Sequence, residues 1–159
     1  DRRGAAEMTG VQMIRAGVIG PFGPLTVVQA GDRLIGLEWR AGPAPLTPLL
    51  KEACRQLQAW FDRRLTRFDL ALDWGEGLNA AVRHAMADIP FGETRTYGQI
   101  AKAVGAPAQA VGQACGANPL PILIPCHRVT GTNWFGGFSA PGGVETKAAL
   151  LRHEGALLL

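Results

Sequence analysis

The sequence predicts a chain of two lobes, a mixed α/β lobe over residues 1–75 and a mostly helical lobe over residues 76–159. Strand-like alternation of apolar residues is confined to the first part of the chain, and apolar residues at helical spacing dominate the rest. The 159 residues, of which 47% are hydrophobic and 18% charged, have a globular composition and room for two lobes but not three.

In the first lobe, residues 25–29 and 34–39 predict a β-hairpin, because a turn containing Gly31 and Asp32 separates two apolar runs. Apolar residues from Leu49 to about Arg64 then recur at helical spacing and predict an amphipathic helix. Residues 68–74 alternate, which is typical of a strand or of an extended connector.

The second lobe begins with helical spacing over residues 78–89. Thr96 predicts an N-cap for a short helix over 97–104, which Gly105 ends, and Pro107 opens a second short helix that runs to Cys115. Two short helices joined by such a turn have the outline of a helix-turn-helix. The second helix carries no charge, which fits either a buried helix or a smooth surface for a DNA minor groove.

Composition excludes several classes of protein. The three cysteines, Cys54, Cys115 and Cys126, form no CxxC pair, and the three histidines lack ligand spacing, so we expect no disulfide framework, metal or cofactor. The apolar runs are too short for a membrane span, and no secretory signal is visible, so we expect a cytoplasmic protein without a membrane partner. The first few residues are left out of the fold prediction, with Met8 as a candidate start.

Net charge permits a nucleic-acid partner without requiring one. The chain carries a formal charge of +3 and a pI near 9.1. Residues 91–155 hold five Lys and Arg against three Asp and Glu, which is too small an excess to predict DNA binding alone.

The segment 124–129, with the letters IPCHRV, places the thiol of Cys126 beside an imidazole and a guanidinium. A thiolate is the reactive form of cysteine, and a nearby base or positive charge increases its population. Free cysteine is also among the residues most often buried for purely structural reasons. The local chemistry leaves both interpretations open.

Several motifs together resemble those of the O6-alkylguanine-DNA alkyltransferases, continuously from residue 89 to residue 155. The motifs are Thr96-Tyr97-Gly98-Gln99-Ile100-Ala101, Ala110-Val111-Gly112, residues 118–129 (NPLPILIPCHRV), Gly137-Phe138-Ser139 and residues 150–155 (LLRHEG). The resemblance implies a ribonuclease-H-like first lobe and a winged-helix-like second lobe containing the helix-turn-helix. The first lobe is similar only in outline.

The resemblance implies direct repair of alkylated DNA. Cys126 would take the alkyl group from O6-alkylguanine, or from O4-alkylthymine, in one irreversible SN2 step per molecule. His127 would act as the base through an ordered water, and Glu154 would orient its ring. A third possibility, a Cys-His hydrolase, lacks an oxyanion-hole signature.

Further roles follow from the same resemblance. Tyr97 and Ser139 would donate hydrogen bonds to the guanine, and Asn118 would tie the recognition helix to the active-site turn. The protein would bind the minor groove, and the base would be flipped out of the stack because O6 is unreachable inside the duplex. The remaining residues assigned to substrate or DNA are Ala108, Gln109, Ala110, Gly112, Arg128 and Phe138. We expect a monomer, associated with the nucleoid if the source is a prokaryote.

Two departures from the family pattern affect the prediction. Gln109 stands where an arginine finger is usual, which predicts weaker attraction to duplex DNA. Phe138 stands where a tyrosine is frequent, and Trp134 and Phe135 are candidate packing or lid residues. The missing arginine leaves an alternative function open, a protein that binds lesions as a sensor with weak or no repair.

Overall fold

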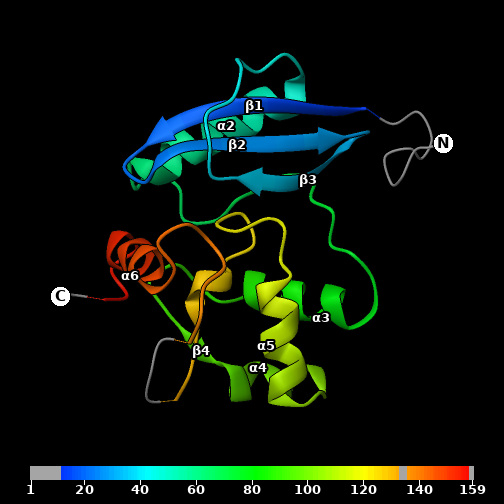
Figure 1. The fold of residues 1–159 in the computed structure, drawn as a ribbon, viewed down its shortest axis with the longest axis vertical. Coiled ribbons are helices and arrows are strands. Elements are labelled where there is room, and N and C mark those ends of the chain that lie inside the picture. The colour runs from blue at the N-terminus through cyan, green and yellow to red at the C-terminus, as the bar shows by residue number, and fades with distance from the viewer. Residues whose placement is uncertain (1–11, 133–135, 158–159) are drawn as a thin grey trace. The chain divides into compact units, whose positions relative to one another are not determined.

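The computed structural model describes residues 12–132 and 136–157, and the chain forms two compact units (Figure 1). The first unit ends at Asp73 and the second begins at Trp74, which places the boundary two residues before the expected one.

The first unit contains a three-stranded antiparallel sheet in the order β1-β2-β3. Its strands are β1 (Met13–Gly20), β2 (Gly23–Ala30) and β3 (Arg33–Glu38). The hairpin of β2 and β3 confirms the sequence prediction, with one register shift between Val28 and Gln29. Strand β1 was not predicted, because it lies at the sheet edge and buries only Ala16 fully. It therefore lacks the alternation that marks a half-buried strand.

Helix α2 (Pro48–Phe61) packs against β1 and β2, and Figure 1 shows it running across one face of the sheet. The Thr47 side chain accepts a hydrogen bond from the backbone of Leu50 and caps the helix. The helix ends before the expected Arg64, because Arg63 has a left-handed φ of 60°. Residues 68–74 form a connector rather than a strand, with a single bridge between Leu72 and Leu34.

Helices predominate over strands in the second unit. Helices α3 (Gly77–Ala87), α4 (Tyr97–Val104) and α5 (Ala108–Gly116) pack against one another. Helix α4 has the bounds that the sequence predicts, because Thr96 and Gln99 form a reciprocal capping box and Gly105 ends it in the left-handed conformation. In α5, Pro107 is the N-cap rather than a residue of the first turn.

The later part of the second unit buries the motif of residues 124–129 in its interior. An apolar segment, in which Leu120, Ile122, Leu123 and Ile124 are buried, follows α5. It leads to the short 3-10 helix η1 (Cys126–Arg128), and β5 (Val129–Thr130) then pairs in parallel with β4 (Arg95–Thr96). Helix α6 (Val144–His153) packs on η1.

Within the described ranges, no helix has both the length and the apolar character that a membrane crossing requires.

Candidate active site

Cys126 opens η1 and lies at the wall of a cavity of about 630 Å³. The thiol-bearing residue is 8% exposed, so it is reached through this cavity rather than from the open surface. Helices α4 and α5, η1 and the loop before α6 supply the lining residues, which are Tyr97, Ala108, Gln109, Gly112, Cys115, Gly116, Cys126, Gly137, Phe138 and Ser139.

The cavity gathers most of the residues that the sequence assigned to substrate, from segments up to 42 positions apart between Tyr97 and Ser139. Ala110 does not line it and is half-buried in α5. Trp134 and Phe135 lie outside the described residues. Three lining residues were missed, Cys115, Gly116 and Gly137, because nothing in their local sequence indicates that they face a cavity.

The side chain of His127 reaches Glu154, the residue that caps the C-terminal end of α6. Its Nε2 atom lies 2.9 Å from Oε1 of Glu154, and the His127 side chain is fully buried. The other ring nitrogen, Nδ1, is buried and has no hydrogen-bond partner among the described residues. The structure thus pairs the two residues that the sequence assigned to base and orienter.

Burial and charge determine the protonation of this pair. Burial lowers the pKa of His127, although Glu154 favours the charged ring, so the imidazole is neutral at neutral pH. Burial alone would raise the pKa of Glu154, but hydrogen bonds from Arg128 and His127 outweigh it and lower that pKa to about 2. Because ionised Glu154 only accepts hydrogen bonds, Nε2 of His127 carries the ring hydrogen and Nδ1 keeps a free lone pair.

Arg128, which the sequence assigned to substrate or DNA, is not among the residues that line the cavity. It is 5% exposed, and its guanidinium donates from Nε to Glu154 Oε1 at 2.9 Å and from Nη2 to Oε2 at 2.7 Å. A third donor, Nη1, bonds the carbonyl oxygen of Ile89 at 2.6 Å. A buried guanidinium requires an anion, and Glu154 supplies it inside the unit.

Asn118 follows α5 and braces the turn that leads to Cys126. Its Nδ2 donates to the carbonyl oxygen of Ile124 at 2.9 Å, and its Oδ1 accepts from the backbone N–H of Leu120 at 3.0 Å. Two satisfied bonds from one buried amide hold the segment 120–124 in a loop, although Ile122 adopts a left-handed φ of 72°.

Burial raises the pKa of Cys126, while Asn118 and the charge of Lys147 act in the opposite direction. The neighbouring imidazole and guanidinium do not produce a resting thiolate, since both are directed at Glu154. The thiol is therefore protonated in the free protein and requires a base before it can attack.

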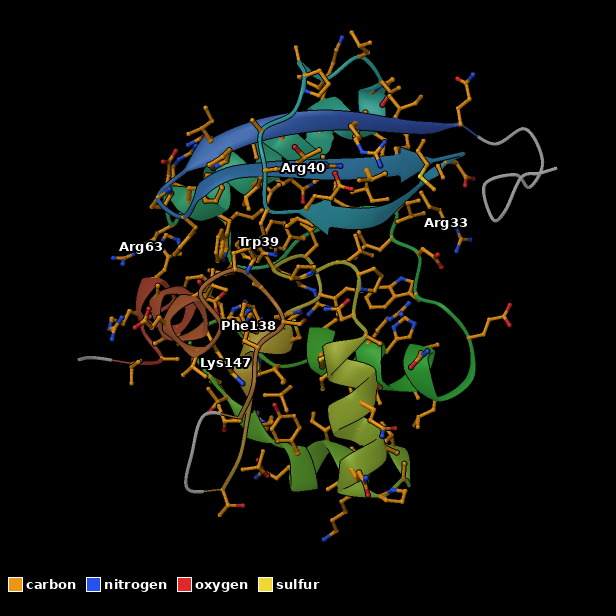
Figure 2. All side chains as sticks on the ribbon, in the orientation of Figure 1. Arg33, Trp39, Arg40, Arg63, Phe138 and Lys147 are labelled. Atoms are coloured by element: carbon orange, nitrogen blue, oxygen red, sulfur yellow. The ribbon has the colours of Figure 1, made fainter. Side chains whose placement is uncertain are left out.

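Lys147 is a buried cation that the sequence analysis missed. Its Nζ donates to the carbonyl oxygens of Val129 and Gly137 and lies 5.8 Å from the ring centroid of Tyr97, and burial lowers its pKa to about 8. Figure 2 labels it near Phe138. One signal was available: Lys147 precedes Leu150 and Leu151 by three and four residues, which places it on the buried face of α6.

Tyr97 is half-buried at the start of α4, and burial raises its pKa, with Cys115 and Cys126 adding to the effect. Its hydroxyl lies close to the backbone of Gly136, where a Cβ atom would approach within 2.5 Å. Gly136 also has a φ of 78°, so this position requires glycine on both grounds. Tyr97 and the loop before α6 therefore form one continuous part of the cavity wall.

Few other polar side chains line the cavity. Ser139 is exposed, and its hydroxyl lies 3.4 Å from the carbonyl oxygen of Gly116, across from α5. Cys115 is buried with its sulfur 3.6 Å from that of Met86, and burial raises its pKa to about 12. Cys115 is thus far less acidic than an ordinary thiol. No group of three or more His, Cys, Asp or Glu within the described ranges is arranged to hold a metal ion.

The chain is similar in sequence and in structure to named methyltransferases. Residues 78–156 match the family model described as "6-O-methylguanine DNA methyltransferase, DNA binding domain". The methylated-DNA--protein-cysteine methyltransferase of Mycobacterium tuberculosis is 41% identical over 146 residues, which cover 84% of this chain and 87% of that protein. The constitutive enzyme of the same name from Bacillus subtilis is 38% identical over 149 residues, which cover 84% and 90%.

Comparison with solved structures indicates the same family as the comparison of sequences. The crystal structure of Mycobacterium tuberculosis OGT in complex with DNA has a TM-score of 0.78 and 40% identity, over 89% of this chain and 92% of that chain. The chain therefore belongs to the methylated-DNA--protein-cysteine methyltransferase family.

Proposed function

We propose that this protein repairs DNA by transferring an alkyl group from O6 of guanine to Cys126, once per molecule. The observation that supports it most is the buried His127 behind Cys126, whose Nδ1 carries a free lone pair while Glu154 holds Nε2. Related enzymes of known name act on methylated DNA, and one solved relative is bound to DNA.

The transfer is an SN2 displacement in which each bond and proton has a place. The sulfur of Cys126 forms a bond to the alkyl carbon as the bond from that carbon to O6 breaks, and the electron pair stays on the guanine. The thiol proton passes to Nδ1 of His127 through a water, and the Tyr97 hydroxyl, which keeps its own proton, donates a hydrogen bond that stabilises the negative charge left on the departing guanine. Because burial raises the pKa of Cys126, this base is necessary rather than auxiliary.

The cavity fits a base that has left the duplex. Its volume of about 630 Å³ lies within the range of small-molecule sites, and an aromatic wall at Phe138 provides a stacking surface. We place α5 in the minor groove, where Ala108 and Gly112 allow close approach and Gln109 enters the space of the flipped nucleotide. Asn118 holds α5 and the turn before Cys126 in register, and Ser139 is a second donor to the base. On this proposal the second unit is a winged-helix-like DNA-binding domain, the first a ribonuclease-H-like lobe, and the protein acts as a monomer.

A sensor that binds lesions without repair is not favoured, because it has no use for a thiol at the cavity wall backed by a neutral base. The smaller attraction expected from Gln109 affects how tightly DNA is held, not whether Cys126 can react.

Intact-mass measurement tests the proposal. After incubation with an oligonucleotide that contains O6-methylguanine, the protein should gain the mass of one methyl group, located by peptide mapping at Cys126. Cys126→Ser should gain none, and Cys115→Ser, which removes the other cavity thiol, should still be methylated. Retained DNA binding with an unchanged mass would favour the sensor, and methylation at Cys115 would overturn the assignment of the acceptor.

A further inference from the structure

We infer that Arg128 is a positioning residue: it fixes the Glu154 carboxylate and, through it, holds the ring of His127 with Nδ1 as the proton acceptor. The inference rests on the alkyl transfer proposed above, and it assigns to Arg128 a role other than contact with substrate. Arg128 acts through Glu154 and His127 and does not touch the reacting atoms.

The guanidinium binds the carboxylate in a fork. Nε bonds Oε1 and Nη2 bonds Oε2, so the plane of the Glu154 carboxylate is set by two parallel hydrogen bonds. Oε1 also accepts the hydrogen on Nε2 of His127. The direction of that shared oxygen, and therefore the rotation of the imidazole, depends on how Arg128 holds the carboxylate.

The guanidinium is itself anchored to a third segment. Nη1 bonds the carbonyl oxygen of Ile89, which is 39 positions away in the chain and follows α3. The ring of Phe91 lies beneath the guanidinium, 5.9 Å from ring centroid to Cζ. Arg128 thus joins η1, the segment after α3 and the end of α6, and it ties the catalytic pair to the packed interior.

The positive charge of Arg128 also decides where the proton of the pair resides. Among the described residues, the charged groups that shift the pKa of His127 are Glu154, Arg128 and Lys147, and those that shift the pKa of Glu154 are His127 and Arg128. Because the guanidinium neutralises the carboxylate, the imidazole need not become the compensating cation. His127 stays neutral and can accept the thiol proton.

Removal of the guanidinium charge would change this balance in a defined way. In Arg128→Met the buried carboxylate would draw a proton into the pair. If the proton stays on His127, the ring becomes an imidazolium; if it stays on Glu154, the carboxyl group donates to Nε2 and the ring hydrogen moves to Nδ1. Both arrangements place a hydrogen on Nδ1 and so remove the lone pair that accepts the thiol proton in the proposed transfer.

The protonation of each ring nitrogen can be measured by nitrogen NMR on protein in which the three histidines are labelled with ¹⁵N. The signals of His127 are assigned by their loss in His127→Gln. In the wild type we expect Nδ1 of His127 to be unprotonated and Nε2 protonated at pH 6 to 8. In Arg128→Met we expect protonated Nδ1 over the same range. An unprotonated Nδ1 in that variant would overturn the inference. Because the measurement requires no substrate, it tests Arg128 even if the wild type transferred no alkyl group, a result that would refute the proposed function alone.

Arg128→Lys provides a second test if the methionine variant does not fold. It retains the positive charge but not the fork, so His127 should stay neutral while the single-turnover rate on an O6-methylguanine oligonucleotide at saturation falls by roughly tenfold. A rate equal to that of the wild type would show that the fork is dispensable and overturn the positioning role. The dissociation constant for the same oligonucleotide, measured in a Cys126→Ser background, should be the same with and without Arg128→Lys. A weaker affinity would indicate that Arg128 contacts DNA.

A double-mutant cycle with Glu154 completes the test. If Arg128 acts through Glu154, then Arg128→Lys should change the rate by less than about twofold in a Glu154→Gln background. A further tenfold loss there would contradict the inference. Arg64→Met is the matched control, because Arg64 pairs with Asp62 at 3.2 Å on an exposed surface, and its rate and histidine spectra should match the wild type.

Discussion

The two sides of Cys126 differ in kind. Behind it, His127, Arg128 and Glu154 form a buried set of polar groups whose protonation depends on mutual contact. In front of it, the wall supplied by α5 consists of small or uncharged residues such as Ala108, Gln109 and Gly112. A substitution among the residues behind the thiol leaves a buried charge without its partner. A substitution in the α5 wall in front of it breaks no charged contact and places the new side chain in the open cavity. We therefore expect large effects behind Cys126 and small ones in front.

The largest effect should follow loss of the base. His127→Gln should lower the single-turnover rate of alkyl transfer by about 10² to 10⁴-fold, the usual contribution of general base catalysis, with little change in DNA affinity. His84→Gln is the control, since His84 stacks on Trp74 outside the cavity lining. A rate for His127→Gln within a fewfold of the wild type would mean that the buried side does not supply the base.

The next largest effect concerns stability. Glu154→Gln leaves the guanidinium of Arg128 buried without its anion and should lower the free energy of unfolding by about 3 to 5 kcal/mol, measured by urea denaturation. The control, Glu93→Gln, breaks an exposed pair with Arg95 and should cost less than about 1 kcal/mol. Equal losses in the two variants would remove the distinction between buried and exposed charge on which the comparison rests.

Acid should destabilise the protein in two stages. The pKa of His127 is lowered by burial, so below its ordinary value of 6.5 the unfolded chain binds a proton that the folded chain does not, and stability falls as pH decreases. The pKa of Glu154 is lowered from 4.5 to about 2, so a second loss, of a few kcal/mol, occurs between those values. Unfolding measured against pH should show both stages in the wild type, and His127→Gln should lack the first.

The smallest effect should be in front of the thiol. Gln109→Arg should tighten binding to duplex DNA and steepen the dependence of log affinity on log salt by about 1, as expected for one added phosphate contact. The transfer rate at saturation should stay within about twofold, because the buried side is untouched. Gln113→Arg, an exposed position on α5 outside the cavity lining, controls for charge alone. Equal affinities and rates for Gln109→Arg and the wild type would contradict the expected role of Gln109.

Some elements were predictable to the residue because their signals are local. Helix α4 begins after Thr96 and ends at Gly105, and both signals lie within the helix ends themselves. Strand β1 was missed, because it depends on hydrogen bonds to β2 and shows little burial of its own. Residues 68–74 were ambiguous for the same reason, since only the bridge to Leu34 distinguishes a connector from a strand.

The sequence by itself determined which reactive groups the chain carries and in which motifs they lie. These are the thiol of Cys126 and the imidazole of His127 in one motif and the carboxylate of Glu154 in another. The tertiary structure decided what state each group is in. Arg128 was expected to contact substrate, yet its partners lie 26 and 39 positions away, at Glu154 and Ile89. Lys147 likewise becomes an interior cation only because α6 packs on η1. The physical reason is that pKa values and hydrogen-bond directions depend on burial and on distances between atoms, and these exist only after distant segments have packed together.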